Sequence, residues 1–334
     1  MAVVVQKFGG TSINSGEGRS ALIRHVKRCK AEGDDVIVVV SAMGRKGEPY
    51  ATDSLLNILY QAGNTIDPKK KDLIMSCGEV IACALIGHLL DINGICAESL
   101  SGCQAGIRTD SNYNNSEIIS IDTSIIQNHI KQGKTLVIAG FQGTTDKGEI
   151  TTLGRGGSDT TAAAIGGYLN AKRVDIFTDV PGVAVVDPRI VSKVQYLDHI
   201  SYRDMYKLAS HGAKVLHPRA VETAEKYQVP VRVLSTFEDS PGTLITSDAI
   251  LEDQKIIGIS LEKEVYNEGI GRISIFYNKN YQSEIIRVLS EHLKELNYSH
   301  VEMILEDDYS SILVPTEMMK ACVESIYSLF YDFA

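Results

Sequence analysis

The stretch VVVQKFGGTS, residues 3–12, joins a run of valines to a lysine and a pair of glycines. Continuous β-branched runs, rather than alternating ones, are typical of strands buried on both faces of a parallel sheet. Further runs of this kind occur at residues 36–40, 136–139 and 174–178, with helical patterns between them. The sequence therefore predicts an α/β fold with a mostly parallel central sheet, helices on both faces, and ligands at the carboxyl ends of the strands.

Helical patterns and a polar stretch predict the domain organisation. The expected helices lie at residues 18–32, 53–62, 69–93, 116–132, 158–169 and 201–227. The polar residues 247–255 indicate a linker. Beyond it we expect strands at 256–261, 272–277, 301–305 and 311–314, a helix at 281–296 and another from 316. The prediction is a large α/β domain at residues 1–250 and a small α+β module at residues 251–334.

Composition narrows the class of protein. The chain has 33 basic and 42 acidic side chains, a net charge of -9, and no lysine or arginine run that would form a basic stripe, so we expect no nucleic-acid partner. Its six cysteines lack zinc-ligand spacing and fit reduced thiols. We see no signal peptide and no apolar run long enough to cross a bilayer, which predicts a cytoplasmic protein without a membrane partner.

The glycines that follow the first strand predict a phosphate-binding turn. In KFGGTS, Gly9 and Gly10 let the backbone amides turn toward an anion, and Lys7 adds a positive charge. Taken alone, the same residues also fit a simple strand-to-helix turn with a surface lysine.

A second glycine-rich region contains GFQG at residues 140–143 and GRGGSD at residues 154–159. Ser158 and Asp159 fall at an expected helix start, where free amides and the helix dipole favour anionic ligands. Asp159 alone also fits a helix N-cap. An arginine inside a glycine loop has little value for helix stability, but the fork of Arg155 suits a substrate carboxylate.

A third region runs from FTDVPGV, residues 177–183, to DPR, residues 187–189. It fits a loop around a nucleotide base and ribose with Arg189 near the phosphates, or an ordinary turn-rich connection. Lys214, in HGAKVLHPRA at residues 211–220, taken alone fits a solvated or capping lysine. The chain has no Walker motif, no His-Arg-Asp catalytic loop and no dinucleotide fingerprint.

Read in order, these motifs, together with VVVSAMG at residue 38 and SCGE at residue 76, resemble the aspartate kinases of the amino acid kinase family over residues 1–245. Within that family, KFGGTS, SCGE and GRGGSD favour aspartate kinase over the glutamate, acetylglutamate, carbamate and uridylate kinases. The resemblance implies ATP-dependent phosphorylation of the side-chain carboxylate of L-aspartate to 4-phospho-L-aspartate. That reaction is the first step toward lysine, threonine, methionine and diaminopimelate.

The resemblance also implies residue roles. Catalysis would rest on Lys7, Asp159 and Lys214. The residues implied for ATP are Lys7, Gly9, Gly10, Ser41, Thr178, Asp179, Val183, Arg189 and Lys214. Those implied for aspartate are Ser41, Thr52, Glu79, Phe141, Arg155 and Ser158. Mg²⁺ would bridge the phosphates largely through water and nucleotide oxygens, with no metal site built from protein side chains.

The C-terminal region departs from the family pattern. Aspartate kinases usually carry two ACT modules that bind an amino-acid effector and form the dimer, whereas residues 251–334 suffice for a single ACT-like module. We expect a homodimer through this module, and one hypothesis is an enzyme insensitive to end products. Two alternatives remain open: a kinase of the same fold that acts on another acidic amino acid, and a non-catalytic amino-acid-sensing pseudokinase.

Overall fold

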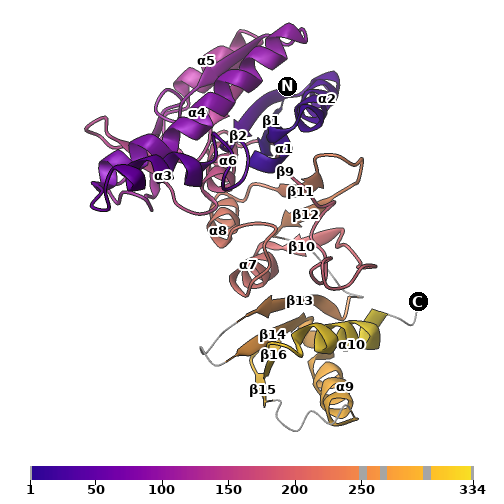
Figure 1. The fold of residues 1–334 in the computed structure, drawn as a ribbon. Helices are drawn as coiled ribbons and strands as arrows, with labels where there is room; N and C mark the ends of the chain where they lie inside the picture. Colours follow the sequence, from indigo (N-terminus) through magenta and orange to yellow (C-terminus); the bar gives the residue numbers. More distant parts are fainter. Residues whose placement is uncertain (1, 248–253, 264–268, 296–301, 332–334) are drawn as a thin grey trace. The chain divides into compact units, whose positions relative to one another are not determined.

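The computed structural model describes residues 2–247, 254–263, 269–295 and 302–331 (Figure 1). The chain divides into two compact units, the first made of Met1–Pro181 and Arg219–Thr246, the second of Gly182–Pro218 and Ser247–Ala334. Most of the predicted linker at residues 247–255, and the predicted boundary at residue 250, lie outside the described residues. The domain ranges 1–250 and 251–334 therefore stay a prediction.

The main sheet of the first unit is built from the valine-rich runs. Its strands follow the order β12-β11-β9-β1-β2-β6-β3, with parallel pairing throughout except for the antiparallel pair β11 and β12. The strands are β1 (Val3–Phe8), β2 (Asp35–Val40), β3 (Ala97–Leu100), β6 (Thr135–Ala139), β9 (Arg173–Thr178), β11 (Val231–Ser235) and β12 (Thr243–Thr246). The predicted fold class is confirmed, and the five residues from Val36 to Val40 are all at most 1% exposed, as a strand covered on both faces requires.

Helices cover both faces of this sheet. The helices of the first unit are α1 (Gly10–Asn14), α2 (Gly16–Ala31), α3 (Thr52–Ala62), α4 (Pro68–Ile92), α5 (Ser124–Lys131), α6 (Gly157–Tyr168) and α8 (Pro218–Lys226), and among them α3 packs on α4 rather than on the sheet. Val4 and Phe8 of β1 share one core with Leu22 of α2 and Ile86 of α4. Helix α6 packs on β1, β2 and β9 from the other face. Because side chains alternate along a strand, Lys7 lies on the α6 face.

Helix α4 has a composition that the sequence analysis did not recognise. Within the described part of the chain it is the one helix whose length and apolar composition would suffice to cross a membrane, so the expectation that no such run exists is wrong. Half of its most apolar window is buried inside the protein, and Cys83, Ile86 and Leu90 join the core above the sheet. Its apolar side is therefore largely explained by packing.

Two predicted helices are shorter than expected. The first third of the predicted helix at 116–132 instead contains strand β5 (Ile118–Ile121), in which Ile121 is buried and Ile119 is exposed to solvent. The predicted helix at 201–227 is two helices, α7 (Tyr202–Ser210) and α8. Gly212 adopts φ +107°, which ends the first helix, and Pro218 begins the second, where its missing N–H costs nothing.

A smaller sheet in the first unit has the order β5-β4-β7-β8. Its other strands are β4 (Ile107–Thr109), β7 (Gln142–Thr144) and β8 (Ile150–Thr152). Strands β7 and β8 form an antiparallel hairpin that begins within the motif GFQG and ends before GRGGSD. The hairpin thus returns the chain to the end of β6, and the backbone N–H of Leu153 donates to the carbonyl of Phe141 at 2.8 Å.

The second unit contains an antiparallel sheet in the order β13-β14-β16-β15. Its elements are β10 (His199–Ser201), α7, β13 (Ile256–Glu262), β14 (Ile270–Tyr277), the 3₁₀ turn η1 (Lys279–Tyr281), α9 (Gln282–Glu295), β15 (Glu302–Leu305), β16 (Tyr309–Pro315) and α10 (Met319–Tyr331). The predicted helix end at 296 and strand start at 301 lie outside the described residues. Helix α7 packs against β13, where a Cβ on Gly258 would meet the Leu208 side chain at 2.5 Å.

Candidate active site

An ion pair lies at the carboxyl end of β1. Lys7 Nζ is 2.7 Å from Asp159 Oδ1, and both side chains are largely buried, with 12% and 14% exposed. Within the described residues Asp159 Oδ1 has no hydrogen-bond partner, and this ion pair is its contact. Asp159 stands in the first turn of α6, and the N-cap is Gly156 at φ +70°, so Asp159 is not the helix cap. Its carboxylate faces a lysine from the neighbouring strand.

The predicted phosphate-binding turn follows directly after this lysine. A Cβ on Gly9 would lie 3.5 Å from Lys7 Nζ, so the lysine head group sits over the glycine backbone. A Cβ on Gly10 would come within 2.2 Å of the Ala42 carbonyl oxygen, which leaves room for glycine alone. The two glycines therefore allow the turn after β1 to pack closely on the loop after β2, where the Ser41 N–H donates to the Phe8 carbonyl at 3.2 Å.

Glu79 reaches the other side of the same loop. Its Oε1 accepts the Ala42 backbone N–H at 3.0 Å, while its Oε2 has no hydrogen-bond partner. Burial raises the pKa of this carboxyl to about 8, and the Ala42 hydrogen bond offsets a part of the shift. A buried acceptor without a donor suits a ligand that brings a positive charge. Thr52 is half-buried and begins α3. It follows Tyr50, whose carbonyl oxygen would lie 2.9 Å from a Cβ on Gly78, the residue before Glu79.

The two glycine motifs of the hairpin meet beside α6. Phe141 adopts φ +69°, and its N–H donates to Thr161 Oγ1 at 3.0 Å. A Cβ on Gly140 would meet Ser158 at 2.9 Å, and a Cβ on Gly157 would meet Phe141. The close approach brings Phe141 and Ser158 together, one residue from the Lys7–Asp159 pair. Arg155 is exposed in the loop, and no hydrogen bond or ion pair to another described residue engages it.

Two residues with no predicted role hold this loop. Arg219 donates from its guanidinium to the carbonyls of Leu153 and Ser116, the latter at 2.8 Å. Asp72 of α4 is fully buried and accepts from Thr152 Oγ1 at 2.6 Å and from the backbone N–H of Thr152 at 2.9 Å. Burial raises its pKa despite these hydrogen bonds. Arg219 had a sequence signal, since it lies in HGAKVLHPRA, whereas Asp72 had none.

Two further predicted nucleotide residues of the first unit, Thr178 and Asp179, lie at the end of β9. Thr178 Oγ1 donates to Asp179 Oδ1 at 3.1 Å, and Asp179 Oδ2 lies 3.8 Å from Arg45 Nη2 in an exposed ion pair. Arg45 was not predicted, although a basic pair between two glycines directly after the β2 run was a usable signal. Lys7 and Thr178 thus lie at the carboxyl ends of the adjacent strands β1 and β9, and Arg45 lies in the loop that follows β2, the next strand of the sheet.

The remaining predicted residues belong to the second unit. Val183 is buried, and Arg189 binds Asp187 through Nε at 2.9 Å and through Nη2. The Arg189 hydrogen bonds, and to a smaller extent the charge of Lys214, hold the pKa of Asp187 below its usual range. Arg189 and Lys214 therefore share one electrostatic neighbourhood in this unit. Their roles toward ATP stay predictions.

No metal-binding cluster emerges from the described residues. Nowhere within ranges 2–247, 254–263, 269–295 and 302–331 do three or more His, Cys, Asp or Glu side chains group in a way that would hold a metal ion. All six cysteines lie in these ranges and are free thiols.

Comparison with known proteins places these motifs in a family context. The model of the amino acid kinase family matches residues 2–235. The chain is 48% identical to aspartokinase 1 of Bacillus subtilis (strain 168) over 247 residues, which are 74% of this chain and 61% of that protein. It is 44% identical to an aspartokinase of Geobacillus stearothermophilus over 79% of this chain and 64% of that protein. The chain thus spans less than two thirds of the length of these relatives.

Solved structures show the same fold. The crystal structure of E. coli aspartokinase III in complex with aspartate and ADP superimposes with a TM-score of 0.80 at 21% identity, covering 98% of this chain and 100% of that one. The aspartate kinase from Synechocystis gives a TM-score of 0.66 at 27% identity, covering 98% of this chain and 69% of that one.

Proposed function

Since the chain belongs to the amino acid kinase family, we propose that it transfers the γ-phosphoryl group of ATP to the side-chain carboxylate of L-aspartate, giving 4-phospho-L-aspartate. The observation that carries the proposal is the Ala42 peptide. Its carbonyl adjoins the Gly10 turn and its N–H binds Glu79, so the turn proposed for phosphate and a buried carboxylate contact the same loop. Relatives at 44% and 48% identity that bear the name aspartokinase support the same assignment.

The first unit offers complementary groups for an amino diacid. Glu79, with an unpartnered buried oxygen, would receive the substrate ammonium, and the exposed guanidinium of Arg155 would bind a carboxylate in its fork. Ser41, Thr52, Phe141 and Ser158 would line the rest of the pocket. Holding both charged ends of the substrate fixes the position of the side-chain carboxylate.

Phosphoryl transfer would need positioning and charge balance from the protein. The substrate carboxylate is ionised near neutral pH, because an Asp side chain has a pKa of about 3.9, so it attacks phosphorus without a general base. Lys7 and the amides of Gly9 and Gly10 would balance the charge on the transferring phosphoryl group. Asp159, 2.7 Å from Lys7 Nζ, would orient that ammonium. Lys214 is proposed as a second cation.

The remaining roles toward ATP are proposed from the family resemblance. We propose Thr178 and Asp179, with Val183, around the base and ribose, and Arg189 near the phosphates. The described residues offer no cluster of carboxylates that would hold Mg²⁺. Because Mg²⁺ prefers phosphate and water oxygens, we propose that it binds together with the nucleotide. When bound, it supplies charge neutralisation on the phosphate oxygens.

Trapping the product tests the proposal. The purified chain is incubated with ATP, Mg²⁺, hydroxylamine and either L-aspartate or L-glutamate, and the hydroxamate is measured. We expect hydroxamate from aspartate, and a smaller yield from glutamate, because one methylene is worth about 1 to 3 kcal/mol of discrimination. The Lys7→Ala variant serves as the control. A yield from aspartate no greater than that of the control refutes the activity, and a preference for glutamate refutes the substrate.

The wider role is proposed on the same basis. The product would enter the synthesis of lysine, threonine, methionine or diaminopimelate in the cytoplasm, an environment that suits the six free thiols. A homodimer would form through the C-terminal module, whose sheet has β13 and β15 as its edges. Sedimentation of the purified chain gives the oligomeric state, and activity with added lysine and threonine tests whether end products regulate it.

A further inference from the structure

A polar cavity lies on the face of the main sheet opposite Lys7. It has a volume of about 320 Å³, and its lining comes from α2, from β1, β9 and β11, and from Ser240 after β11. Gln6 lines it and is the neighbour of Lys7 on β1, so the two side chains project to opposite faces of the sheet. Every lining residue belongs to the first unit. The cavity is thus separate from the candidate active site.

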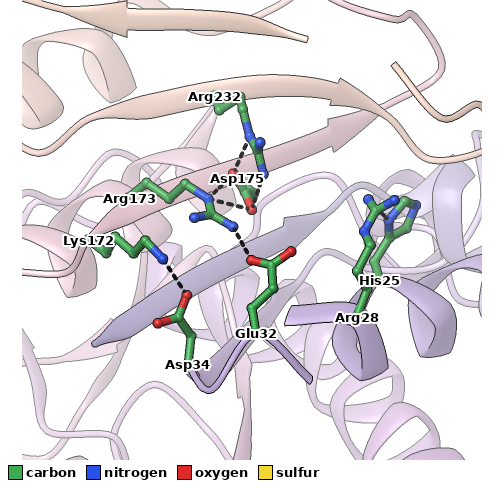
Figure 2. Close-up of polar contacts among 8 residues, drawn as sticks. All are labelled: His25, Arg28, Glu32, Asp34, Lys172, Arg173, Asp175 and Arg232. Atoms are coloured by element: carbon green, nitrogen blue, oxygen red, sulfur yellow. Dashed lines mark hydrogen bonds and ion pairs between the residues drawn. The ribbon is translucent and has the colours of Figure 1, made fainter. Parts of the chain in front are cut away.

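Three guanidinium groups surround this space (Figure 2). Arg28 comes from α2, Arg173 from β9 and Arg232 from β11. Asp175, 1% exposed, accepts from Arg173 Nε at 3.1 Å and from Arg232 Nε and Nη2 at 2.9 and 3.0 Å. Because a guanidinium has five N–H donors, donors remain on both arginines after these contacts.

The carboxylates in the lining limit how much negative charge a ligand can carry. Glu32 lies 3.8 Å from Arg173 Nη2, and Asp175 is the second lining carboxylate. Three guanidinium groups face two carboxylates in the lining, and Asp239, which is not part of the lining, pairs with Arg28 at 2.8 Å, so these charges balance. The cavity therefore offers N–H donors without a large positive field, which suits a single carboxylate and disfavours a polyphosphate.

His25 adds no positive charge to the lining. Its Nδ1 lies 3.1 Å from Arg28 Nη2, which can only donate, and its Nε2 lies 3.0 Å from the Thr236 carbonyl, which can only accept. Both contacts are satisfied by the neutral tautomer with hydrogen on Nε2. Burial lowers the pKa of His25, in agreement with that form.

Gln6 points to the second feature of the ligand. It is 2% exposed, and its Oε1 has no hydrogen-bond partner. A buried acceptor left without a donor is costly, so a ligand that supplies a hydroxyl or ammonium hydrogen there gains from filling it. Phe177 and Leu234 give the same cavity an apolar surface.

We infer that this cavity binds a small organic monocarboxylate that also carries a hydroxyl or ammonium donor. The carboxylate pairs with the free N–H groups of Arg28, Arg173 and Arg232, and the donor binds Gln6 Oε1. The volume is at the lower end of ligand pockets, roughly 300 to 1,000 Å³, which fits a metabolite and not a nucleotide. This inference is independent of the proposed phosphoryl transfer.

Equilibrium dialysis with labelled L-lactate and propionate tests the inference. The two probes differ by one hydroxyl, and L-aspartate with a non-hydrolysable ATP analogue is present to fill the active site. We expect saturable binding of one equivalent, about two- to tenfold tighter for lactate, the range of a single net hydrogen bond. Absence of saturable binding at millimolar concentrations, or equal affinity for both probes, overturns the inference.

Variants locate the bound probe. Arg28→Ala, at the half-exposed edge of the cavity, should weaken both probes, whereas Lys27→Ala, the exposed neighbour on the same helix, should leave both unchanged. Gln6→Leu should remove the preference for lactate, with its fold checked by circular dichroism. Glu79→Gln should not affect either probe. Lactate binding that survives Arg28→Ala but is lost in Glu79→Gln lies in the active site and overturns the inference.

Discussion

Replacing Glu79 with glutamine tests whether its buried carboxylate receives the substrate ammonium. In the unliganded protein burial raises the pKa of Glu79 to about 8, so at pH 7 the side chain is mostly protonated. Binding an ammonium requires the ionised form. Deprotonation one pH unit below the pKa costs about 1.4 kcal/mol, a factor of ten in affinity. We therefore expect the KM for aspartate to fall about tenfold for each pH unit as the pH rises from 6 toward 8.

Glutamine keeps the shape of the side chain and removes its titration. The variant should lose the pH dependence of KM in this range. At pH 8 its KM should exceed that of the parent by about 10- to 150-fold, because a hydrogen bond to a charged group contributes about 1.5 to 3 kcal/mol. The turnover number should change little, since the ammonium lies away from the reacting oxygen.

Initial rates of ADP release, measured across aspartate concentrations at pH 6, 7 and 8, give both constants. Glu17→Gln, an exposed carboxylate on α2, is the matched control and should keep the parent's pH profile. A Glu79→Gln enzyme that retains the parent's pH slope of KM would show that another group binds the ammonium, and the pocket assignment would be wrong.

Further outcomes follow from the structure. Lys7→Ala should lower kcat by about 10² to 10³, the usual effect of losing one transition-state charge, and Asp159→Asn should lower kcat with little change in KM; rate measurements at saturating substrates check both. Gly10→Ala should destabilise the fold by about 1 to 3 kcal/mol, since its Cβ would meet a carbonyl oxygen at 2.2 Å; urea denaturation measures this, and an unchanged midpoint contradicts the packing. Arg219→Ala should raise the proteolysis rate of the glycine loop, with Arg287→Ala on an exposed helix as control. The lowered pKa of His25 means that the unfolded state binds more protons below about pH 6.5, so stability should fall as the pH drops from there, and less so in His25→Gln.

The strands of the main sheet were predictable because burial on both faces leaves a continuous valine-rich signature. Val36 to Val40 show it in the sequence and are buried in the structure. The two shortened helices were not predicted for local reasons. The isoleucines of β5 also fit a helix pattern in the sequence. Their strand conformation depends on pairing with β4, which the local sequence does not show. At Gly212 the left-handed backbone ends α7, although the sequence shows no more than a glycine.

The contacts of the site were predictable where each partner stands in a glycine motif of its own, and unpredictable where one partner contributes backbone atoms alone. Lys7 and Asp159 stand in recognisable glycine motifs, and the structure brings them to 2.7 Å. Arg219 binds the backbone carbonyl of Ser116. Because every residue has such a carbonyl, no pattern of side chains in the sequence predicts this contact. Asp72 likewise binds backbone groups from another element. The roles of all the predicted site residues toward substrate and nucleotide remain predictions.

The C-terminal module forms one compact unit with a segment from the middle of the chain, so it is not independent of the preceding sequence. Gly182–Pro218 packs with residues after 246, and through Leu208 and Gly212 it contacts β13. A protein cut at residue 250 would therefore expose the underside of α7 and leave a 37-residue excursion without its support. Since that excursion carries Lys214, loosening the last strands would cost the protein one of its proposed catalytic cations, even though no residue beyond 246 touches a substrate in the proposal.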